Sequence, residues 1–487
     1  MTEDSGGFRD AFFLKRYALN PTLGFEFSES TNLTVSFEHL SDHRLADRGV
    51  PSQAGRPFAA AAHQLFGSAN QNDARNGNDT ASVVFEHRFS PQLLLRNSFL
   101  SGQYDKFYQN VYPGSAVNAS GTFSLAAYNH EVDRTNTFNQ TDLIYTVRTG
   151  GISHTLLAGT EFGHQFQDEL RVTAAAINNV PAASPVRDAD FASAPTTVNR
   201  HATSDIAAVY VQDQLALGAG FKAVVGARTD RFAVSVDDRL PVNVDLARTD
   251  VATSPRAGVI YQPTRSASIY SSYSYTFLPS GQTLGLAANT AQLTPENARN
   301  YEVGAKLDLL DQRLNVSAAL FRLDRNNVKN TDPNDPTRLV LTGRQRTEGL
   351  TLSASGSVIP RWKIYGGYAN LNARIAADTS SAPAGRRVGL VPRSQFTLWS
   401  TYDISTSWGA GVGIVDQTKM YASFSNQVRL PGFSRVDAAV YYRVQGYRVA
   451  INIENAFNAD YYPTANGDNN ISPGAPRSAK VSVSRRF

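Results

Sequence analysis

Hydrophobic and polar residues alternate along most of this chain with a period of two. Near the C-terminus, Val481 and Val483 fall on one face while Ser482 and Ser484 fall on the other. Such alternation is typical of β-strands with one apolar face, and no stretch of comparable length shows a helical period. The pattern therefore predicts an all-β protein. The clearest examples are NYEVGAKLDLL (300–310), EGLTLSASGSV (348–358), SRVDAAVYYRV (434–444) and YRVAINIENAF (447–457).

The connections between these predicted strands alternate between short and long. Short turns such as VQGY (444–447) and LLDQR (309–313) are followed by long polar stretches, although long structureless loops are uncommon in compact domains. All short turns would then lie at one end of the sheet and all long loops at the other, as in a transmembrane β-barrel. The predicted long loops are 41–78, 105–132, 168–200, 235–252, 278–296, 327–344, 373–390, 420–430 and 463–476.

The physical chemistry of a bilayer explains both faces of such strands. In hydrocarbon every backbone N–H and C=O needs a partner, so the sheet must close, with an apolar face toward lipid and a polar face toward the lumen. Val481, Val483 and Phe487 are predicted to form the strand that closes the barrel, where aromatic residues favour the membrane interface. Predicted lipid-facing residues are Val303, Leu307, Leu352, Val440, Val449 and Ile451. Predicted lumen-facing residues are Glu302, Lys306, Arg435, Arg443, Asn452 and Glu454.

Composition excludes several other classes of protein. The chain has no cysteine, no apolar run long enough for a transmembrane helix and no recognisable signal peptide. Its net charge of +4 is too small to favour nucleic-acid binding. A soluble β-sandwich or propeller stays open as an alternative, but the blade repeat of a propeller is absent. No catalytic motif is found, so an enzyme is not expected, and His39, His43 and His63 are not favoured as metal ligands.

The pattern predicts about 19 strands, whereas single-chain bacterial barrels normally have an even number. An odd count suggests that strands are missing at the N-terminus. The N-terminal segment DSGGFRDAFFLKRYAL (4–19) is predicted to open as a loop, before a strand formed by RYALNPTLGFEF (16–27).

Several segments, in order along nearly the whole chain, resemble the barrel of TonB-dependent siderophore receptors, and most of all the catecholate group. The segment NIENAFNADYY (452–462) is similar to the family's Asn-Leu-Phe-Asp-Lys-x-Tyr-Tyr motif, with Ala456 and Ala459 in place of its Leu and Lys. Arg485 stands where the family usually has an aromatic or apolar residue. The other matching segments are RGVPS (48–52), YVQDQL (210–215), VVGARTDRF (224–232), SPRAGVIYQPT (254–264), IYSSYSYTFLPSG (269–281), 293–328, RQRTEGLTLSASG (344–356), VPRSQFTLWSTYD (391–403) and ISPGAPRSAKVSVSRRF (471–487).

This resemblance implies a 22-stranded barrel around a plug domain in the outer membrane of a Gram-negative cell. It also implies import of a ferric siderophore, driven by the TonB–ExbB–ExbD complex through a TonB box. The barrel-assembly machinery and lipopolysaccharide are further implied partners. Residues 1–487 match the barrel without the plug, so one truncated barrel domain is expected, either as part of a receptor or as a plugless passive pore. No resident cofactor is expected, since iron would enter only within the siderophore.

The candidate ligand-binding residues follow from the chemistry of ferric catecholates, which are aromatic and strongly anionic. Arg or Lys beside Tyr or Phe would supply Coulomb attraction and cation–π contacts. The richest segment is QYDKFYQNVY, in the predicted loop 105–132 and the residues just before it. The alternative is that the aromatic residues form the interface girdle and the cations contact lipopolysaccharide phosphates. The candidates are Tyr104, Lys106, Phe107, Tyr108, Tyr112, Arg44, Arg48, Arg325, Arg386 and Arg429.

Overall fold

The computed structural model describes residues 1–241, 244–286, 291, 293–331 and 339–485. All regular elements among these residues are β-strands, and every described strand pairing is antiparallel. The prediction of an all-β fold is therefore confirmed. The described part of the chain contains no helix with the length and hydropathy that crossing a membrane requires.

The chain divides into two compact units, which are described separately. The first comprises Met1–Arg48, Leu65–Val259 and Tyr273–Arg299, and the second comprises Gly49–Gln64, Ile260–Ser272 and Asn300–Phe487. The first unit contains β1 (Thr2–Gly6), β2 (Phe13–Leu19), β3 (Thr22–Ser28), β4 (Thr31–Arg44), β7 (Asp73–Ser90), β8 (Leu93–Pro113), β9 (Thr122–Thr149), β10 (Ile152–Pro181), β11 (Thr196–Gly218) and β12 (Phe221–Asp238).

Three strands are shared between the units, namely β13 (Leu246–Thr264), β14 (Ala267–Leu278) and β15 (Glu296–Leu309). The second unit contains β5 (Ser52–Gln53), β6 (Arg56–Pro57), β16 (Leu314–Thr331), β17 (Leu339–Ile359), β18 (Trp362–Ile375), β19 (Ser394–Asp403), β20 (Trp408–Gln417), β21 (Met420–Tyr421), β22 (Arg429–Leu430), β23 (Phe433–Val444), β24 (Tyr447–Glu454), β25 (Thr464–Ala465), β26 (Ile471–Ser472) and β27 (Ser478–Arg485).

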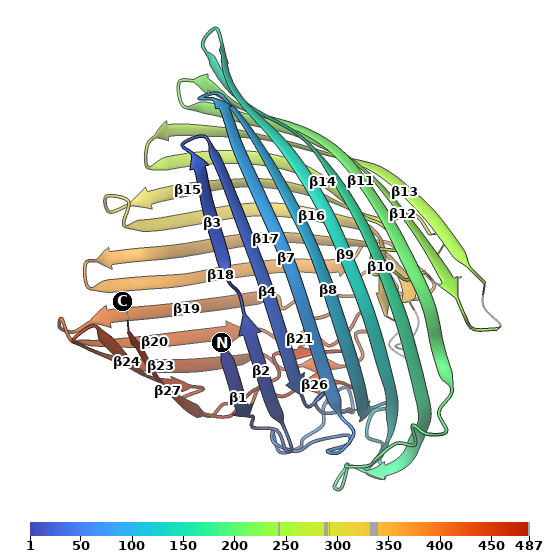
Figure 1. Cartoon of the computed structure of the whole chain (residues 1–487). Helices are drawn as coiled ribbons and strands as arrows, with labels where there is room; N and C mark the ends of the chain where they lie inside the picture. Colours follow the sequence, from blue (N-terminus) through green and yellow to red (C-terminus); the bar gives the residue numbers. More distant parts are fainter. Residues whose placement is uncertain (242–243, 287–290, 292, 332–338, 486–487) are drawn as a thin grey trace. The chain divides into compact units, whose positions relative to one another are not determined.

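Several strands of the first unit are much longer than a bilayer requires. β9 has 28 residues and β10 has 30, whereas about 9–11 residues span a membrane. These two strands lie side by side from their short turn to their far ends (Figure 1). The predicted long loops 105–132 and 168–200 are therefore largely wrong, because only residues 114–121 separate β8 from β9 and only 182–195 separate β10 from β11.

The N-terminus also differs from the prediction. Residues 4–19 were expected to begin as a loop, but Thr2–Gly6 forms β1, paired antiparallel with β2. The strand expected next is interrupted at Asn20 and Pro21, and its two halves, β2 and β3, pair with successive parts of β4. The additional strand and this interruption account for 21 strands of five or more described residues where about 19 were expected.

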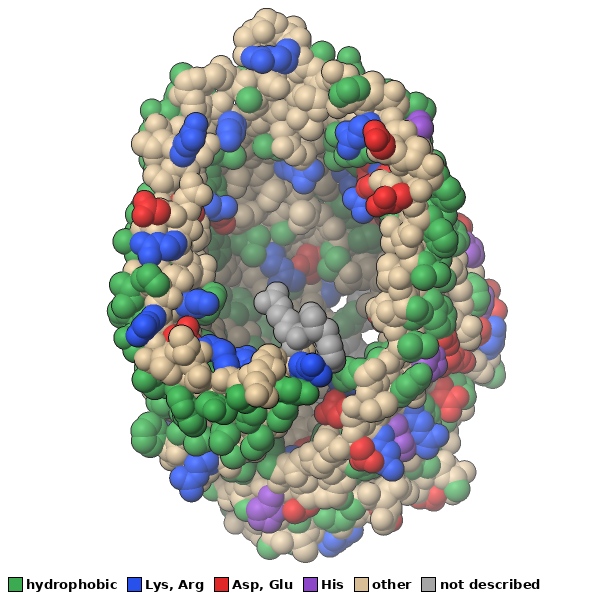
Figure 2. All heavy atoms as spheres, turned by 60° about the vertical axis from the view of Figure 1, so that its left-hand side comes forward, with side chains coloured by type: hydrophobic (Ala, Val, Ile, Leu, Met, Phe, Trp, Pro, Cys, Tyr) green, Lys and Arg blue, Asp and Glu red, His purple; other side chains and the backbone are tan. Residues whose placement is uncertain are grey.

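The two faces of the sheet differ as the alternation predicts. Val440 on β23 and Ile451 on β24 are each 47% exposed, while Ala439, Tyr441 and Ala450 pack on the opposite face, beside Trp399. Val303, Leu307 and Leu352 are likewise exposed, and Val449 is half-buried. In Figure 2 hydrophobic side chains form patches among polar side chains and backbone, and charged groups are scattered between them.

The C-terminal strand β27 pairs with β24 and continues the apolar face. Val481 lies opposite Ile451, and Val483 lies opposite Val449. The guanidinium of Arg485 lies 5.0 Å from the ring centre of Tyr447, so this cation stacks on an aromatic neighbour. Phe487, predicted to end this strand, lies outside the described residues.

A charge placed on the apolar face tests which surface contacts lipid. Replacing Leu352 with Arg is expected to lower the free energy of unfolding in lipid vesicles by about 2–4 kcal/mol, the cost of an arginine near the bilayer midplane. The matched control is Ser353→Arg on the opposite face, which loses one hydrogen bond to Ser317, worth about 1 kcal/mol. Equal destabilisation by both variants, measured by urea unfolding, contradicts the face assignment.

Candidate ligand-binding site

Arg48, just beyond the end of β4, is the centre of an aromatic cluster. Its guanidinium carbon lies 5.5, 4.6 and 5.3 Å from the ring centres of Tyr108, Tyr112 and Tyr128. Its Nε donates a hydrogen bond of 3.1 Å to the Tyr108 hydroxyl, and a terminal nitrogen donates to the Tyr128 hydroxyl. One cation thus holds three tyrosines in fixed positions.

The register of β8 and β9 places these tyrosines on one face. Tyr108 lies opposite His130 and Tyr112 opposite Ala126, without a register shift between them. Because side chains alternate with a period of two, Tyr104 and Lys106 point to the same face as Tyr108. Tyr104 lies directly across from Arg134 of β9. This face therefore carries a row of tyrosines with cations beside it.

Arg171 of β10 completes what we call the Arg–Tyr cluster: Arg48, Tyr108, Tyr112, Tyr128 and Arg171. Its guanidinium lies 3.9 Å from the ring centre of Tyr128, and its Nε is buried without a hydrogen-bond partner among the described residues. Burial raises the pKa of Tyr128, although the charge of Arg48 opposes this shift. The Tyr128 hydroxyl therefore stays protonated and neutral.

Asn110 lies on the same face of β8, between Tyr108 and Tyr112, and is fully buried. Its Nδ2 donates to the carbonyl of Ala46 at 2.9 Å, but its Oδ1 has no partner among the described residues. Buried polar atoms are almost always hydrogen-bonded, so an unsatisfied one needs an explanation. Asn110 Oδ1 and Arg171 Nε are thus two buried polar atoms left unsatisfied by the described residues.

A hydrogen-bonded network continues this face toward β11. Glu169 accepts a hydrogen bond of 2.7 Å from His130 and pairs with Arg200 at 2.5 Å. Burial alone would raise the pKa of Glu169, but His130 and Arg200 outweigh it, and the pKa lies below its ordinary value. Arg134 donates to Gln167 on the neighbouring strand at 2.9 Å. The carboxylate is thus already neutralised within the network.

The segment after β14 folds against this network. Leu284 and Leu286 pack on Phe232, Val234 and neighbouring apolar residues of β11 and β12. Arg134 also donates a hydrogen bond of 3.2 Å to the carbonyl of Thr283. A connecting segment therefore borders the polar face and holds one of its arginines.

The charges on this face favour an anion. Arg48, Lys106, Arg134 and Arg171 lie on or beside β8, β9 and β10, while Glu169 is engaged by its own partners. Lys106 is exposed and Arg134 half-buried, so both can reach a ligand. Among the described residues no group of His, Cys, Asp and Glu side chains could hold a metal ion. The arrangement suits binding of an anionic ligand with aromatic rings.

The structure brings together part of the predicted site. Arg48, Tyr108 and Tyr112 meet in the Arg–Tyr cluster, and Tyr104 and Lys106 lie on the same face. These residues do not belong to a loop, as predicted, but to β8, because β8 extends to Pro113. That extension carries aromatic and polar residues on both faces, so it lacks the apolar alternation that identified the other strands.

The remaining candidates are placed elsewhere. Phe107 points to the opposite face, where Arg75 lies 5.6 Å from its ring centre, and Arg44 is bound to Asp42 at 2.7 Å. Arg325, in β16, Arg386, after β18, and Arg429, in β22, belong to the second unit. The sequence analysis missed Tyr128, His130, Arg134, Glu169, Arg171 and Arg200. The i, i+2 spacing of YNHEVDR (128–134) could have indicated the first three of these residues.

Comparison with known proteins agrees with this architecture. Residues 19–456 match the family described as TonB dependent receptor-like, beta-barrel. The solved structure of the siderophore receptor PiuA from Acinetobacter baumannii has a TM-score of 0.88 at 22% identity, covering 99% of this chain and 75% of that one. The solved structure of the closed form of the receptor Fiu from Escherichia coli K12 has a TM-score of 0.87 at 24% identity, and the match covers 100% of this chain and 77% of that one.

The chain belongs to the TonB-dependent receptor β-barrel family. It is therefore an outer-membrane receptor with a transmembrane antiparallel barrel, and not an enzyme. It is 28% identical to the metal-pseudopaline receptor CntO of Pseudomonas aeruginosa, covering all of this chain and 70% of that protein. It is 27% identical to the catecholate siderophore receptor Fiu of Escherichia coli, covering all of this chain and 71% of that protein.

The lowered pKa of Glu169 predicts how the site responds to acid. A carboxylate with a depressed pKa stabilises the folded state above its unfolded pKa, near 4.5, and this contribution is lost as the pH falls through the folded value. Glu169→Gln should therefore destabilise the protein at pH 6–7, and the difference from the parent should shrink below about pH 4.5. Thermal unfolding of both proteins, monitored by circular dichroism across this pH range, measures the difference in stability. A difference that is constant with pH contradicts the network.

Proposed function

We propose that this chain forms the barrel of a receptor that imports an anionic ferric siderophore of the catecholate type, with energy from the TonB complex. The observation that carries the proposal is the Arg–Tyr cluster with Lys106 and Arg134 beside it, on one face of β8, β9 and β10. Iron enters as part of the ligand, and no resident cofactor is proposed. The barrel-assembly machinery and lipopolysaccharide are proposed as further partners.

Two features of the cluster favour catecholates among anionic iron complexes. A ferric tris-catecholate presents flat rings, which stack on tyrosine faces, and several negative charges, which cations attract. Tyr112 and Tyr128 are buried, so a ligand would stack on the half-buried rings of Tyr104 and Tyr108. The hydrogen bond from Arg48 to Tyr108 holds the second of these rings, which limits the side-chain entropy lost on binding. Arg171 and Lys106 then supply charge next to prearranged aromatic surface. The similarity to Fiu, a catecholate siderophore receptor, supports the same ligand class.

A second candidate ligand is a carboxylate-rich metal complex. The similarity to CntO, a metal-pseudopaline receptor, favours this alternative. Such a ligand would need the cations of the face but would gain little from the tyrosine rings. Cation and aromatic substitutions therefore distinguish the two candidates.

Titration of the purified chain in detergent with ferric tris(2,3-dihydroxybenzoate) tests the proposal. The double variant Lys106→Gln, Arg171→Gln is expected to weaken binding about tenfold or more, since each close cation contributes roughly 1–2 kcal/mol. Tyr104→Leu should also weaken it severalfold, because a stacking surface is lost. The matched control is Arg361→Gln, Lys363→Gln, which removes two charges at the short turn between β17 and β18 and should leave affinity unchanged.

The same titration with ferric citrate identifies the other ligand class. If citrate binds tightly, loses affinity in the cation variant and keeps it in Tyr104→Leu, the ligand is carboxylate-rich. If the cation variant and the parent bind both probes equally, this face is not the ligand site.

A further inference from the structure

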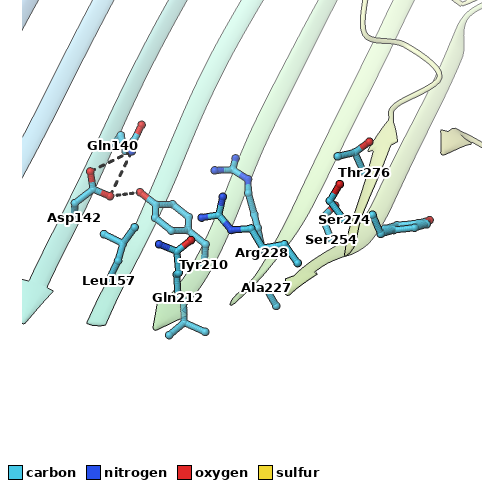
Figure 3. Close-up of a pocket in the computed structure, with 13 residues that line it drawn as sticks. Gln140, Asp142, Leu157, Tyr210, Gln212, Ala227, Arg228, Ser254, Ser274 and Thr276 are labelled. Carbon is cyan, nitrogen blue, oxygen red and sulfur yellow. Dashed lines mark hydrogen bonds between the residues drawn. The ribbon is translucent and has the colours of Figure 1, made fainter. Parts of the chain in front are cut away.

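A shallow apolar groove crosses β9, β10, β11 and β12 on the face opposite the Arg–Tyr cluster. Figure 3 shows the polar face of these strands, where the Tyr210 hydroxyl points toward Asp142 and donates a hydrogen bond to its carboxylate. Because side chains alternate, Val209 and Val211 point to the other face, where both are more than half exposed. The groove has a volume of about 490 Å³, and the side chains that line it on this face are Thr141, Leu143, Ala158, Thr160, Val209, Val211, Ala227 and Thr229.

The groove exists because the side chains beside the two valines are short. Their cross-strand partners on β10 and β12 are Ala158, Thr160, Ala227 and Thr229. The next residues on this face of the same two strands, Phe162 and Val225, are larger and more than half exposed. The volume is within the range of small-ligand pockets, so the groove can hold a hydrocarbon chain between these larger side chains.

Arg231 lies directly beyond the groove on β12. It is exposed, and its partner in the register is Ala207 of β11. Its guanidinium makes no hydrogen bond or ion pair with a residue in the described part of the chain. Asp205, two positions before Ala207 on the same face, is bound to His164 at 2.8 Å instead. Arg231 is therefore a cation at the end of an apolar groove, with no carboxylate in contact.

The position of Arg231 along β12 places it at the edge of the membrane. It lies ten residues beyond Phe221, which begins β12 after the short turn from β11. About 9–11 tilted residues span a bilayer, and the short turns of such barrels lie on the periplasmic side. Arg231 therefore lies at the level of the headgroups of the outer leaflet. Arg299 agrees with this level, because it lies ten residues before Leu309 at a short turn, and its guanidinium lies 6.0 Å from the ring centre of Tyr275, an aromatic residue typical of the interface.

We infer that this groove, together with Arg231, binds the lipid A part of lipopolysaccharide, with one acyl chain in the groove and a phosphate at Arg231. This inference rests on the lipopolysaccharide partner in the proposed function, but not on the identity of the imported ligand. Lipid A joins acyl chains to phosphates and occupies the outer leaflet, where the apolar groove meets the unpaired cation. A guanidinium holds phosphate oxygens through two parallel N–H donors, which gives this contact its specificity.

Native mass spectrometry of the whole chain in detergent, titrated with purified lipid A, tests this inference. The parent is expected to bind one molecule more tightly than any further one. Arg231→Gln should weaken this binding about tenfold, through the loss of a charge-assisted contact. The double variant Ala158→Leu, Ala227→Leu fills the groove, keeps its face apolar and should weaken binding severalfold. The matched controls, which should change nothing, are Arg148→Gln at the short turn between β9 and β10 and Ala81→Leu on the same face of β7.

Lipid A stripped of its phosphates tests the contact with Arg231 directly, since it should bind the parent and Arg231→Gln alike. If the parent, Arg231→Gln and the filled variant bind intact lipid A equally, the site is overturned. If the parent binds phosphatidylglycerol as tightly and the same variants lose it, the groove holds a phospholipid and the lipid A assignment is overturned.

The same variants separate this inference from the proposed import function. None of them should change the affinity for ferric tris(2,3-dihydroxybenzoate), because the groove lies on the face opposite the Arg–Tyr cluster. A failure of lipid A binding with unchanged ferric affinity therefore overturns the groove alone. Circular dichroism melts of each variant show whether a loss of binding reflects a loss of fold.

Discussion

The backbone hydrogen bonds between antiparallel neighbours are the constraint on which the rest of this structure depends. From Ser153 to Arg171, β10 keeps one register with β11, and its pairing with β9 is equally regular over the same residues. Because a shift by one residue would turn every side chain to the other face, this register decides which residues share a surface. Arg171, Glu169 and Gln167 meet their partners only because the register is uninterrupted. The same regularity carries the polar face along β9 from Tyr128 to Asp142.

A polar face with many arginines needs compensating charge, and the sequence supplies much of it within single strands. Arg and Asp two positions apart on one strand point to the same face, and they form ion pairs in Arg228–Asp230, Arg248–Asp250 and Arg435–Asp437. Such pairs add about 1 kcal/mol or less where they are exposed. Their more important effect is that Arg228 and Arg248 are each neutralised by a carboxylate. Arg48, Arg134 and Arg171 have no carboxylate partner among the described residues, and the proposed ligand site lies at these positions.

The period-two pattern predicted the strands and their faces, because both depend on local alternation of residues. It could not predict how far the strands extend. Residues 104–112 mix polar residues with Tyr, Phe and Val on both faces, so no apolar face is visible in the sequence, yet they continue β8 because β7 and β9 extend beside them. β1 was missed for a similar reason, because TEDSG has no apolar alternation and becomes a strand through pairing with β2. Within the candidate site, the sequence analysis selected Arg48, Tyr108 and Tyr112 by their residue types. It could not select Tyr128 and Arg171, because their places in the cluster depend on the pairing of different strands, which a single segment of sequence does not reveal.

The roles of the two arginines in the Arg–Tyr cluster differ for a physical reason. Arg48 lies between three rings and donates to two hydroxyls, so its charge is largely enclosed by aromatic surface. A cation in this position orients the rings more than it attracts a distant anion, because it is surrounded by the rings and already donates to two of their hydroxyls. Arg171 contacts one ring and retains unused donor capacity, and Lys106 is exposed on the adjacent strand. Arrangement of the rings and attraction of the ligand are therefore carried by different side chains, so a substitution at Arg48 changes the geometry of the site while a substitution at Arg171 or Lys106 changes its charge.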